Sequence, residues 1–184
     1  LHRIAGSTLG IIGYGTIGSK LWERMRPFNF RELLIYDPSL SEEEERNSGG
    51  RKVSLDMLLA ESDYVSINCP LNDETYHMID EAALRVMKRS AALINTARGG
   101  IIEEEALLGA LESGELRCAG LDVYEIEPLS ADSPLRRCEK VILSDHAGYY
   151  SEEALTTLKR RATENLLSIL RGERPRVGVA GPLA

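Results

Sequence analysis

The stretch Thr8-Leu9-Gly10-Ile11-Ile12-Gly13-Tyr14-Gly15-Thr16-Ile17-Gly18 places three spaced glycines between an apolar run and an amphipathic segment. The run from Thr8 to Ile12 predicts a strand, and residues 16–26 predict a helix that Pro27 stops. In such a G-x-G-x-x-G turn, the first glycine permits the tight turn, the second lets the backbone approach a phosphate, and the third lets the helix pack on the strand. The free N–H groups at the helix start would face that phosphate. Alone the pattern is weak, because glycine clusters also form plain turns.

The rest of the chain alternates between apolar runs of strand length and helix-length amphipathic stretches. We expect strands at residues 33–36, 64–67, 91–94, 118–123 and 141–143, and helices at 55–60, 103–113 and about 151–170. Five or six strands separated by helices predict an α/β fold, a doubly wound parallel sheet of the Rossmann type in three α/β/α layers. Residues 125–137 are expected to form a loop, and the run Glu42 to Glu45 a solvated loop or a frayed helix start.

Asp37 strengthens the interpretation of the glycine turn. It lies 19 residues beyond Gly18, at the end of the strand expected at 33–36. A Rossmann fold places a carboxylate there to accept hydrogen bonds from the adenosine ribose. That carboxylate would repel a 2′-phosphate, and no arginine follows in Pro38-Ser39-Leu40. The cofactor expected is therefore NAD rather than NADP. The alternative is that Asp37 is a surface turn residue before Pro38.

Four further blocks carry a resemblance to a known family. They are Cys69-Pro70-Leu71-Asn72-Asp73-Glu74-Thr75, Asn95-Thr96-Ala97-Arg98-Gly99-Gly100, Gly120-Leu121-Asp122-Val123-Tyr124-Glu125-Ile126-Glu127-Pro128, and Asp145-His146-Ala147-Gly148. In this order they resemble the signature blocks of D-isomer-specific 2-hydroxyacid dehydrogenases. The resemblance runs from about Gly6 to Val177 and implies an oxidoreductase that transfers hydride between NAD(H) and a D-2-hydroxy acid or 2-oxo acid. One departure is Asp145, which stands where the family commonly has proline.

The resemblance implies a catalytic role for Arg98, Glu127 and His146. Arg98 would hold the substrate's carboxylate and carbonyl, because a planar guanidinium binds such groups with two parallel bonds. His146 would act as general acid in reduction and base in oxidation. Glu127 would pair with His146, and the family's D-x-x-x-x-E-P spacing selects it over Glu125. Taken singly, these three residues would be read as a solvated turn, a loop acid and a helix cap.

The resemblance also implies the cofactor contacts. Beyond the glycines and Asp37, the residues expected to touch the cofactor are Thr16 and Ile17 at the pyrophosphate, Cys69, Pro70 and Thr75 on the adenosine and phosphate side, Thr96, Ala97 and Asp122 at the nicotinamide half, and Arg98, His146 and Gly148. No metal site is expected. Cys69 is interpreted as a small packing residue at the rim of the cofactor site, and Trp22 and the leucines of the last helix as packing residues. His2 and His77 are expected at the surface.

The domain organisation expected from the resemblance is incomplete. Residues 1–150 would form the NAD-binding domain and 151–184 a C-terminal helix and tail, whereas the family's substrate-binding domain would be absent, because only nine residues precede Gly10. The isolated chain is therefore expected to bind NAD but to be poorly active. A second function class stays open: the block 148–154 is reminiscent of C-terminal-binding-protein corepressors, which would make the chain an NAD(H)-responsive scaffold module.

Composition excludes several other classes. The 22 Lys and Arg residues against 29 Asp and Glu give a net charge of −7, which argues against a general nucleic-acid binder. No apolar run is long enough to span a membrane, and the N-terminus does not read as a signal peptide. Three cysteines without metal-type spacing fit a reducing cytoplasm. The expected partner is a small 2-hydroxy or 2-oxo acid, and the full-length protein is expected to be a homodimer.

Overall fold

The computed structural model describes residues 3–175, so the expectation for His2 and for the tail at 176–184 lies outside the described residues. Contacts divide the chain into two units after His146. The first unit contains a seven-stranded, fully parallel sheet in the order β3-β2-β1-β4-β5-β6-β7. The strands are β1 (Thr8–Ile12), β2 (Glu32–Tyr36), β3 (Arg51–Lys52), β4 (Tyr64–Ile67), β5 (Ala92–Asn95), β6 (Cys118–Leu121) and β7 (Val141–Leu143).

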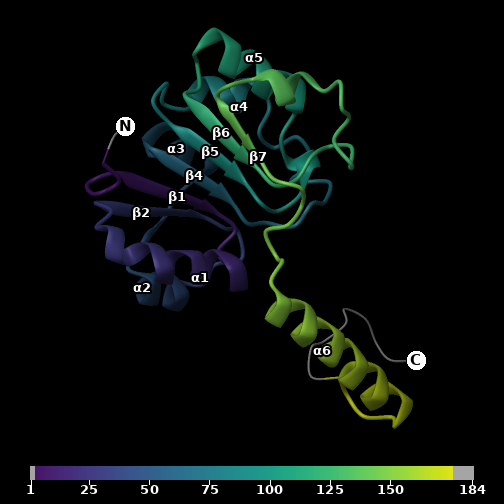
Figure 1. The fold of residues 1–184 in the computed structure, drawn as a ribbon. Coiled ribbons are helices and arrows are strands. Elements are labelled where there is room, and N and C mark those ends of the chain that lie inside the picture. Colours follow the sequence, from purple (N-terminus) through teal and green to yellow (C-terminus); the bar gives the residue numbers. More distant parts are fainter. Residues whose placement is uncertain (1–2, 176–184) are drawn as a thin grey trace. The chain divides into compact units, whose positions relative to one another are not determined.

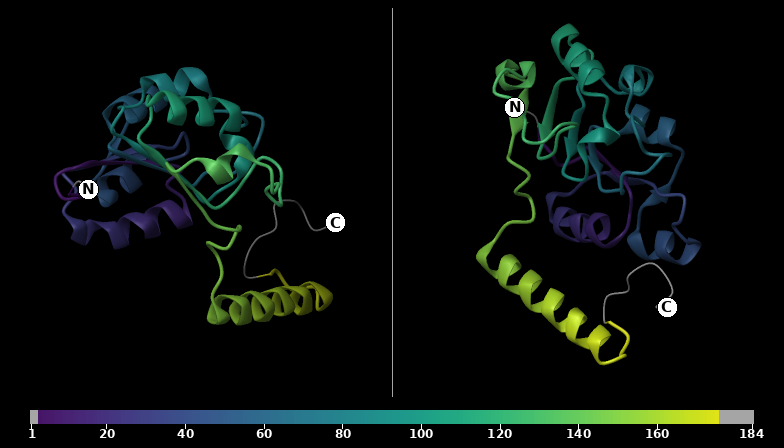
Figure 2. Two further views of the ribbon diagram at one scale, coloured as in Figure 1. Left: turned by 45° about the horizontal axis from the view of Figure 1, so that its top comes forward. Right: turned by 90° about the vertical axis from the view of Figure 1, so that its right-hand side faces the viewer.

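Helices cover both faces of this sheet, which confirms the predicted three-layer Rossmann-type fold. Figures 1 and 2 show α1 (Thr16–Met25) and α2 (Glu42–Ser48) on one face and α3 (Leu55–Glu61), α4 (Glu81–Val86) and α5 (Glu104–Ser113) on the other. Three short 3-10 helices complete the unit, η1 (Arg26–Phe28), η2 (Gly99–Ile101) and η3 (Pro134–Arg137). Because strands buried between two helical layers need apolar residues on both sides, β1 is buried at all five positions.

Each face of the sheet has its own hydrophobic cluster. Leu9, Ile11, Leu33 and Ile35 pack with Leu40 under α1, whose Trp22 contributes its ring and donates a 2.9 Å hydrogen bond from Nε1 to the Ser48 carbonyl of α2. This confirms the packing role expected for Trp22. The larger cluster lies under α3, α4 and α5 and includes fully buried side chains such as Leu58, Leu84 and Leu107.

Strand β3, helix α4 and the 3-10 helices η1, η2 and η3 were not predicted from the sequence. The acidic run, expected as a solvated loop or a frayed helix start, forms helix α2, which begins with a capping box in which Ser41 and Glu44 satisfy each other's backbone N–H groups. The two residues of β3 are exposed and charged, so no apolar run marks them. Helix α4 has only six residues, too few to show a clear helical period. The expected loop at 125–137 is correct except for η3.

The second unit contains one long helix, α6 (Glu152–Leu170), begun by Ser151, whose hydroxyl accepts the Ala154 N–H at 3.0 Å. Within this unit α6 has no buried residue, and Leu158 and Leu170 are 59% and 73% exposed, so the packing role expected for its leucines stays a prediction. Among residues 3–175, no helix combines the length and the apolar character needed to cross a membrane.

Candidate active site

The predicted site residues of the first unit follow the carboxyl ends of successive strands. The glycine turn follows β1, Asp37 follows β2, Cys69 follows β4, Arg98 follows β5, Glu127 follows β6 and His146 follows β7. Parallel strands end at the same edge of the sheet, so residues distant in sequence meet there (Figure 1). The strand order reverses between β1 and β4, which is where open α/β sheets bind ligands.

The glycine turn has the geometry that the pattern predicts. Gly13 has φ +86°, and a Cβ there would lie 2.7 Å from the backbone N of Cys69. A Cβ at Gly18 would lie 2.2 Å from the carbonyl oxygen of Gly13, so only glycine lets α1 approach the turn this closely. A Cβ at Gly15 would meet open space, which leaves the backbone at the start of α1 accessible to a ligand.

Asp37 is held next to this turn by its own hydrogen bonds. Its Oδ2 accepts the Tyr14 N–H at 2.8 Å, and its Oδ1 accepts the N–H and hydroxyl of Ser39 at 2.9 and 2.7 Å. Partial burial opposes ionisation of Asp37, but these bonds outweigh it and hold the pKa of the carboxyl below its usual value. A fixed, ionised carboxylate is what a ribose diol requires.

A cavity of about 370 Å³ joins the turn to Asp37. Its lining is drawn from β1, β2 and the loop after β4: Ile12, Gly13, Gly15, Tyr36, Asp37, Pro38, Ser39, Asn68, Cys69, Pro70, Asn72, Glu74, Thr75 and Met78. Thr75 braces the loop by donating from Oγ1 to the Pro70 carbonyl at 2.7 Å. Burial raises the pKa of the Cys69 thiol to about 11, so Cys69 suits packing rather than nucleophilic chemistry. Apolar lining residues, the Asp37 carboxylate and an open helix start fit the adenosine diphosphate part of NAD.

On the other side of the edge, Glu127 and His146 form the predicted pair. Nδ1 of His146 lies 2.6 Å from Oε2 of Glu127, within hydrogen-bond distance. The hydrogen bond with His146 lowers the pKa of Glu127 from its usual value. His146 has φ +48°, a conformation uncommon outside glycine, and its N–H donates to the Asp122 carbonyl at 2.8 Å. The geometry brings Glu127 rather than Glu125 to the imidazole.

Arg98 lies in the loop after β5, the strand next to β6, directly before η2. Its side chain is exposed. Its Nη1 donates to the carbonyl of Ala97 at 2.6 Å, and its charge contributes to the lowered pKa of Glu127. The turn that presents it is built on Asn95, which is 1% exposed. Asn95 accepts the Ala97 N–H at 3.0 Å and donates to the Arg98 carbonyl at 2.9 Å.

Asp122 is a buried carboxylate at 4% exposure. Its Oδ1 accepts the Ser144 hydroxyl at 2.6 Å, and its N–H donates to the Asn95 carbonyl at 2.9 Å. Asp122 therefore connects the ends of β5 and β7, and with them the segments that carry Arg98 and His146. Asn95 and Ser144 were not predicted as site residues, because their partners lie far away in sequence.

The remaining predicted contacts take different positions. Thr16 and Ile17 begin α1 at the glycine turn and are exposed there, Ile17 at 67%. Thr96 is exposed and Ala97 half-buried in the turn after β5. Gly148 belongs to the second unit, and its role stays a prediction. His77 was expected at the surface, and its side chain is 28% exposed, with Nε2 3.2 Å from Oε1 of Glu125.

Comparison with known proteins agrees with this geometry. The family described as "D-isomer specific 2-hydroxyacid dehydrogenase, NAD binding domain" matches residues 1–148. The chain therefore belongs to the D-isomer-specific 2-hydroxyacid dehydrogenases, as their NAD-binding domain. It is 45% identical over 174 residues to a glyoxylate reductase of Korarchaeum cryptofilum, covering 95% of this chain and 52% of that one. It is also 45% identical over 168 residues to the glyoxylate/hydroxypyruvate reductase B of Cronobacter sakazakii, covering 90% and 51%.

Solved structures give the same result. The apo D-mandelate dehydrogenase of Rhodotorula graminis superposes with a TM-score of 0.90 at 33% identity, covering all of this chain and 54% of that one. The NAD-complexed D-isomer-specific 2-hydroxyacid dehydrogenase of Lactobacillus delbrueckii gives a TM-score of 0.84 at 31% identity, covering 95% and 56%. The chain thus spans about half the length of the relatives it matches. These relatives favour the dehydrogenase interpretation over the corepressor-like alternative.

Proposed function

We propose that this chain is the cofactor-binding and catalytic part of an NAD-dependent reductase that acts on glyoxylate, hydroxypyruvate or a similarly small 2-oxo acid. The observation that carries the proposal is the Glu127–His146 pair, 2.6 Å apart, on the same sheet edge as Arg98 and the glycine turn. The substrate class follows the names of the two reductases that are 45% identical to this chain.

In this proposal the cofactor supplies the hydride, and the side chains supply binding and the proton. The Arg98 guanidinium binds the substrate carboxylate and polarises its carbonyl. With Nδ1 engaged by Glu127, we assign proton transfer to the other ring nitrogen of His146, Nε2. Glu127 fixes the orientation of the imidazole ring, from which the proton moves to the developing alkoxide.

The cofactor residues have equally separate tasks. The N–H groups at the start of α1, at Thr16 and Ile17, would bind the pyrophosphate, and Asp37 the adenosine ribose. Cys69, Pro70 and Thr75 would line the adenosine side. Thr96, Ala97, Asp122 and Gly148 would contact the nicotinamide half. The adenosine contacts are supported by the cavity and the Asp37 carboxylate in it. The nicotinamide contacts are supported by the position of the loops after β5 and β6.

The activity test uses the full-length protein with NADH and a panel of glyoxylate, hydroxypyruvate and pyruvate, followed by the loss of NADH absorbance. His146→Gln should lower kcat by about 10²- to 10⁴-fold, the usual contribution of a general acid. Arg98→Lys should mainly raise the KM for the 2-oxo acid, because lysine cannot form two parallel bonds. NADH binding without reduction of any 2-oxo acid would contradict the proposal and favour the scaffold alternative.

We extend the proposal to the whole protein. Residues 1–150 are assigned to the NAD-binding domain and 151–184 to a C-terminal extension, with substrate contacts completed by a domain that this sequence does not contain. We further propose a homodimer in the cytoplasm, without a nucleic-acid partner, which the net charge of −7 supports. Sedimentation of the full-length protein tests the dimer: a monomer at micromolar concentration would contradict it.

A further inference from the structure

Three segments meet around the peptide that joins Tyr124 to Glu125. Glu104, the first residue of α5, and Glu125, in the loop after β6, bind each other twice. The Glu104 N–H donates to Oε1 of Glu125 at 2.8 Å, and the Glu125 N–H donates to Oε1 of Glu104 at 2.6 Å. Each carboxylate thus binds the other residue's backbone, which fixes both the helix start and the loop.

The loop after β5 closes the third side of this peptide. A Cβ at Gly99 would lie 1.8 Å from the carbonyl carbon of Tyr124 and 2.4 Å from the backbone N of Glu125. Gly99 directly follows Arg98 in the chain. A displacement of the Tyr124–Glu125 peptide would therefore reach Arg98 through the backbone.

His77 connects the loop after β4 to the same place. It has φ +49°, its N–H donates to the Gly100 carbonyl at 2.8 Å, and its ring stacks on Tyr76 with centroids 4.0 Å apart. Its buried Nε2 makes no hydrogen bond and lies 3.2 Å from Oε1 of Glu125. That oxygen is the one that accepts the Glu104 N–H. His77 thus packs beside the carboxylate that holds α5.

Glu127, the partner of His146, lies two residues beyond Glu125. Its Oε1 accepts the Tyr124 N–H at 3.1 Å while its Oε2 contacts Nδ1 of His146. Between them, Ile126 is 80% exposed and gives the segment no anchor in the core. The position of the Glu127 carboxylate therefore depends on the peptide that Glu104 and Gly99 hold.

We propose that Glu104 and Glu125 are positioning residues that hold Glu127 against His146. The catalytic meaning of this inference rests on the proposed function, whereas the contacts among these residues are independent of it. Burial raises the pKa of Glu104, and the nearby Glu125 carboxylate raises it further. The hydrogen bond from the Glu125 N–H acts in the opposite direction but does not cancel these two effects. Placing two carboxylates side by side costs free energy, because like charges repel. The reciprocal bonds that offset this cost fix the position of the loop that carries Glu127.

The first experiment needs no turnover. In the 184-residue chain, NMR can follow the Nδ1–H and the Cε1–Hε1 signals of His146, which is one of only three histidines. Glu104→Ala should move the Cε1–Hε1 signal and abolish the Nδ1–H signal that depends on Glu127. Glu104→Gln keeps an acceptor oxygen without the charge, and should preserve both signals. If Glu104→Ala does not fold, the comparison is made with Glu125→Gln, which also retains an acceptor oxygen, and Glu125→Ala.

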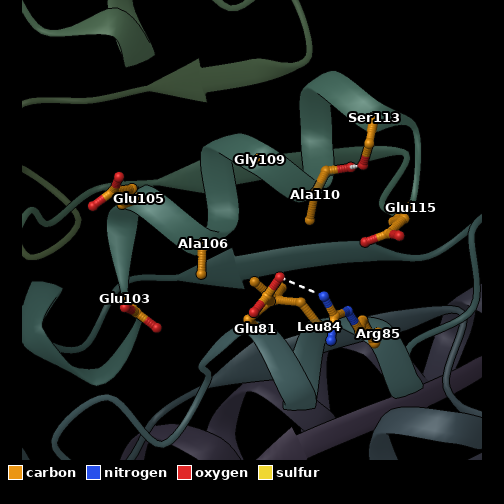
Figure 3. Close-up of a pocket in the computed structure, with 10 residues that line it drawn as sticks. All are labelled: Glu81, Leu84, Arg85, Glu103, Glu105, Ala106, Gly109, Ala110, Ser113 and Glu115. Atoms are coloured by element: carbon orange, nitrogen blue, oxygen red, sulfur yellow. Dashed lines mark hydrogen bonds and ion pairs between the residues drawn. The ribbon is translucent and has the colours of Figure 1, made fainter.

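Glu105→Ala is the matched control. Glu105 lies in the same first turn of α5, is exposed, and lines a separate cavity of about 460 Å³ between α4 and α5 (Figure 3). Its removal takes the same charge from the helix start without touching Glu125. The His146 signals should stay in place. Equal changes in Glu104→Ala and Glu105→Ala would mean a helix-end effect and would overturn the proposal, as would unchanged signals in Glu104→Ala.

The second experiment measures the consequence in the full-length enzyme. Glu104→Ala should lower kcat roughly 10- to 100-fold, the scale expected when a catalytic group is displaced by about 1 Å. The KM for NADH should change less than about twofold, because the adenosine cavity is formed by other loops. A fall in kcat accompanied by an equally large rise in the KM for NADH would indicate general damage and overturn the positioning role. If the NMR signals change as expected but neither the parent enzyme nor any variant reduces a 2-oxo acid, the proposed function is contradicted and the positioning role is not.

Discussion

The nucleotide side and the catalytic side of the sheet edge are built in different ways. On the nucleotide side, Gly13, Gly15 and Gly18 follow one another within a single turn, and Asp37 binds the backbone of that turn at Tyr14. On the catalytic side, Arg98, Glu127 and His146 come from three loops that are joined by hydrogen bonds between side chains and backbone. The nucleotide side is therefore local and carried by backbone shape, whereas the catalytic side depends on contacts between distant segments.

Gly99→Ala gives the largest expected effect and would break the catalytic side where the loop after β5 packs directly on the Tyr124–Glu125 peptide. Its Cβ would overlap the Tyr124 carbonyl carbon at 1.8 Å, and the rigid neighbour cannot move aside. We expect a loss of about 3 kcal/mol or more in the free energy of unfolding. Urea unfolding measures this. Gly109→Ala in α5 is the control: a Cβ there meets nothing within 4 Å, so it should stabilise by about 0.5–1 kcal/mol.

A pair of substitutions in the glycine turn sharpens the contrast between shape and ligand contact. Gly13→Ala should cost about 1–3 kcal/mol of stability, because φ +86° and the Cys69 backbone both oppose a Cβ. Gly15→Ala has space for its Cβ and should change stability by no more than about 1 kcal/mol. We nevertheless expect it to weaken NADH binding, since the methyl group points where the pyrophosphate would lie. Calorimetric titration and thermal unfolding of both variants separate the two effects; unchanged affinity in Gly15→Ala would contradict the assigned phosphate contact.

Asp37→Ala tests whether the nucleotide side selects NAD. We expect NADH binding to weaken roughly 10- to 100-fold, as for the loss of hydrogen bonds to a charged group. The preference for NADH over NADPH should disappear, because the carboxylate that repels a 2′-phosphate is gone. Both ligands are titrated by calorimetry. Ser39→Ala keeps the carboxylate and removes only a supporting bond, so it should retain the preference.

The smallest effect concerns the pH dependence of the catalytic pair. Because the folded-state pKa of Glu127 lies below its usual value, its contribution to stability is present above the unfolded-state pKa and is lost as pH falls through the folded-state pKa. The difference in stability between the parent and Glu127→Gln should therefore be present near neutral pH and shrink in acid. It should stay below about 1 kcal/mol, since the two side chains are 41% and 35% exposed. Denaturant unfolding over an acid pH series measures it, and a difference that grows in acid would contradict the pairing.

The same contrast explains what the sequence could predict. The strand before the glycine turn is predicted by its apolar run, and the turn by glycine spacing, because both signals are local. The partners of Asn95, Ser144 and His77 are set by strand order, so nothing in their neighbourhood marks them. The catalytic role proposed for Arg98, Glu127 and His146 was predicted only through family resemblance. The leucines of α6 show the limit of an apolar pattern, which predicts a helix but does not identify what the helix packs against.

The reciprocal bonds of Glu104 and Glu125 also have a dynamic consequence. Each amide hydrogen is held by the other residue's side chain, so moving the loop away from the helix start breaks both bonds at once. The two amides should therefore be protected from deuterium exchange to a similar degree, although one lies at a helix start and one in a loop, both places where exchange is ordinarily fast. Through this pair, a surface loop would open only as often as the helix beside it.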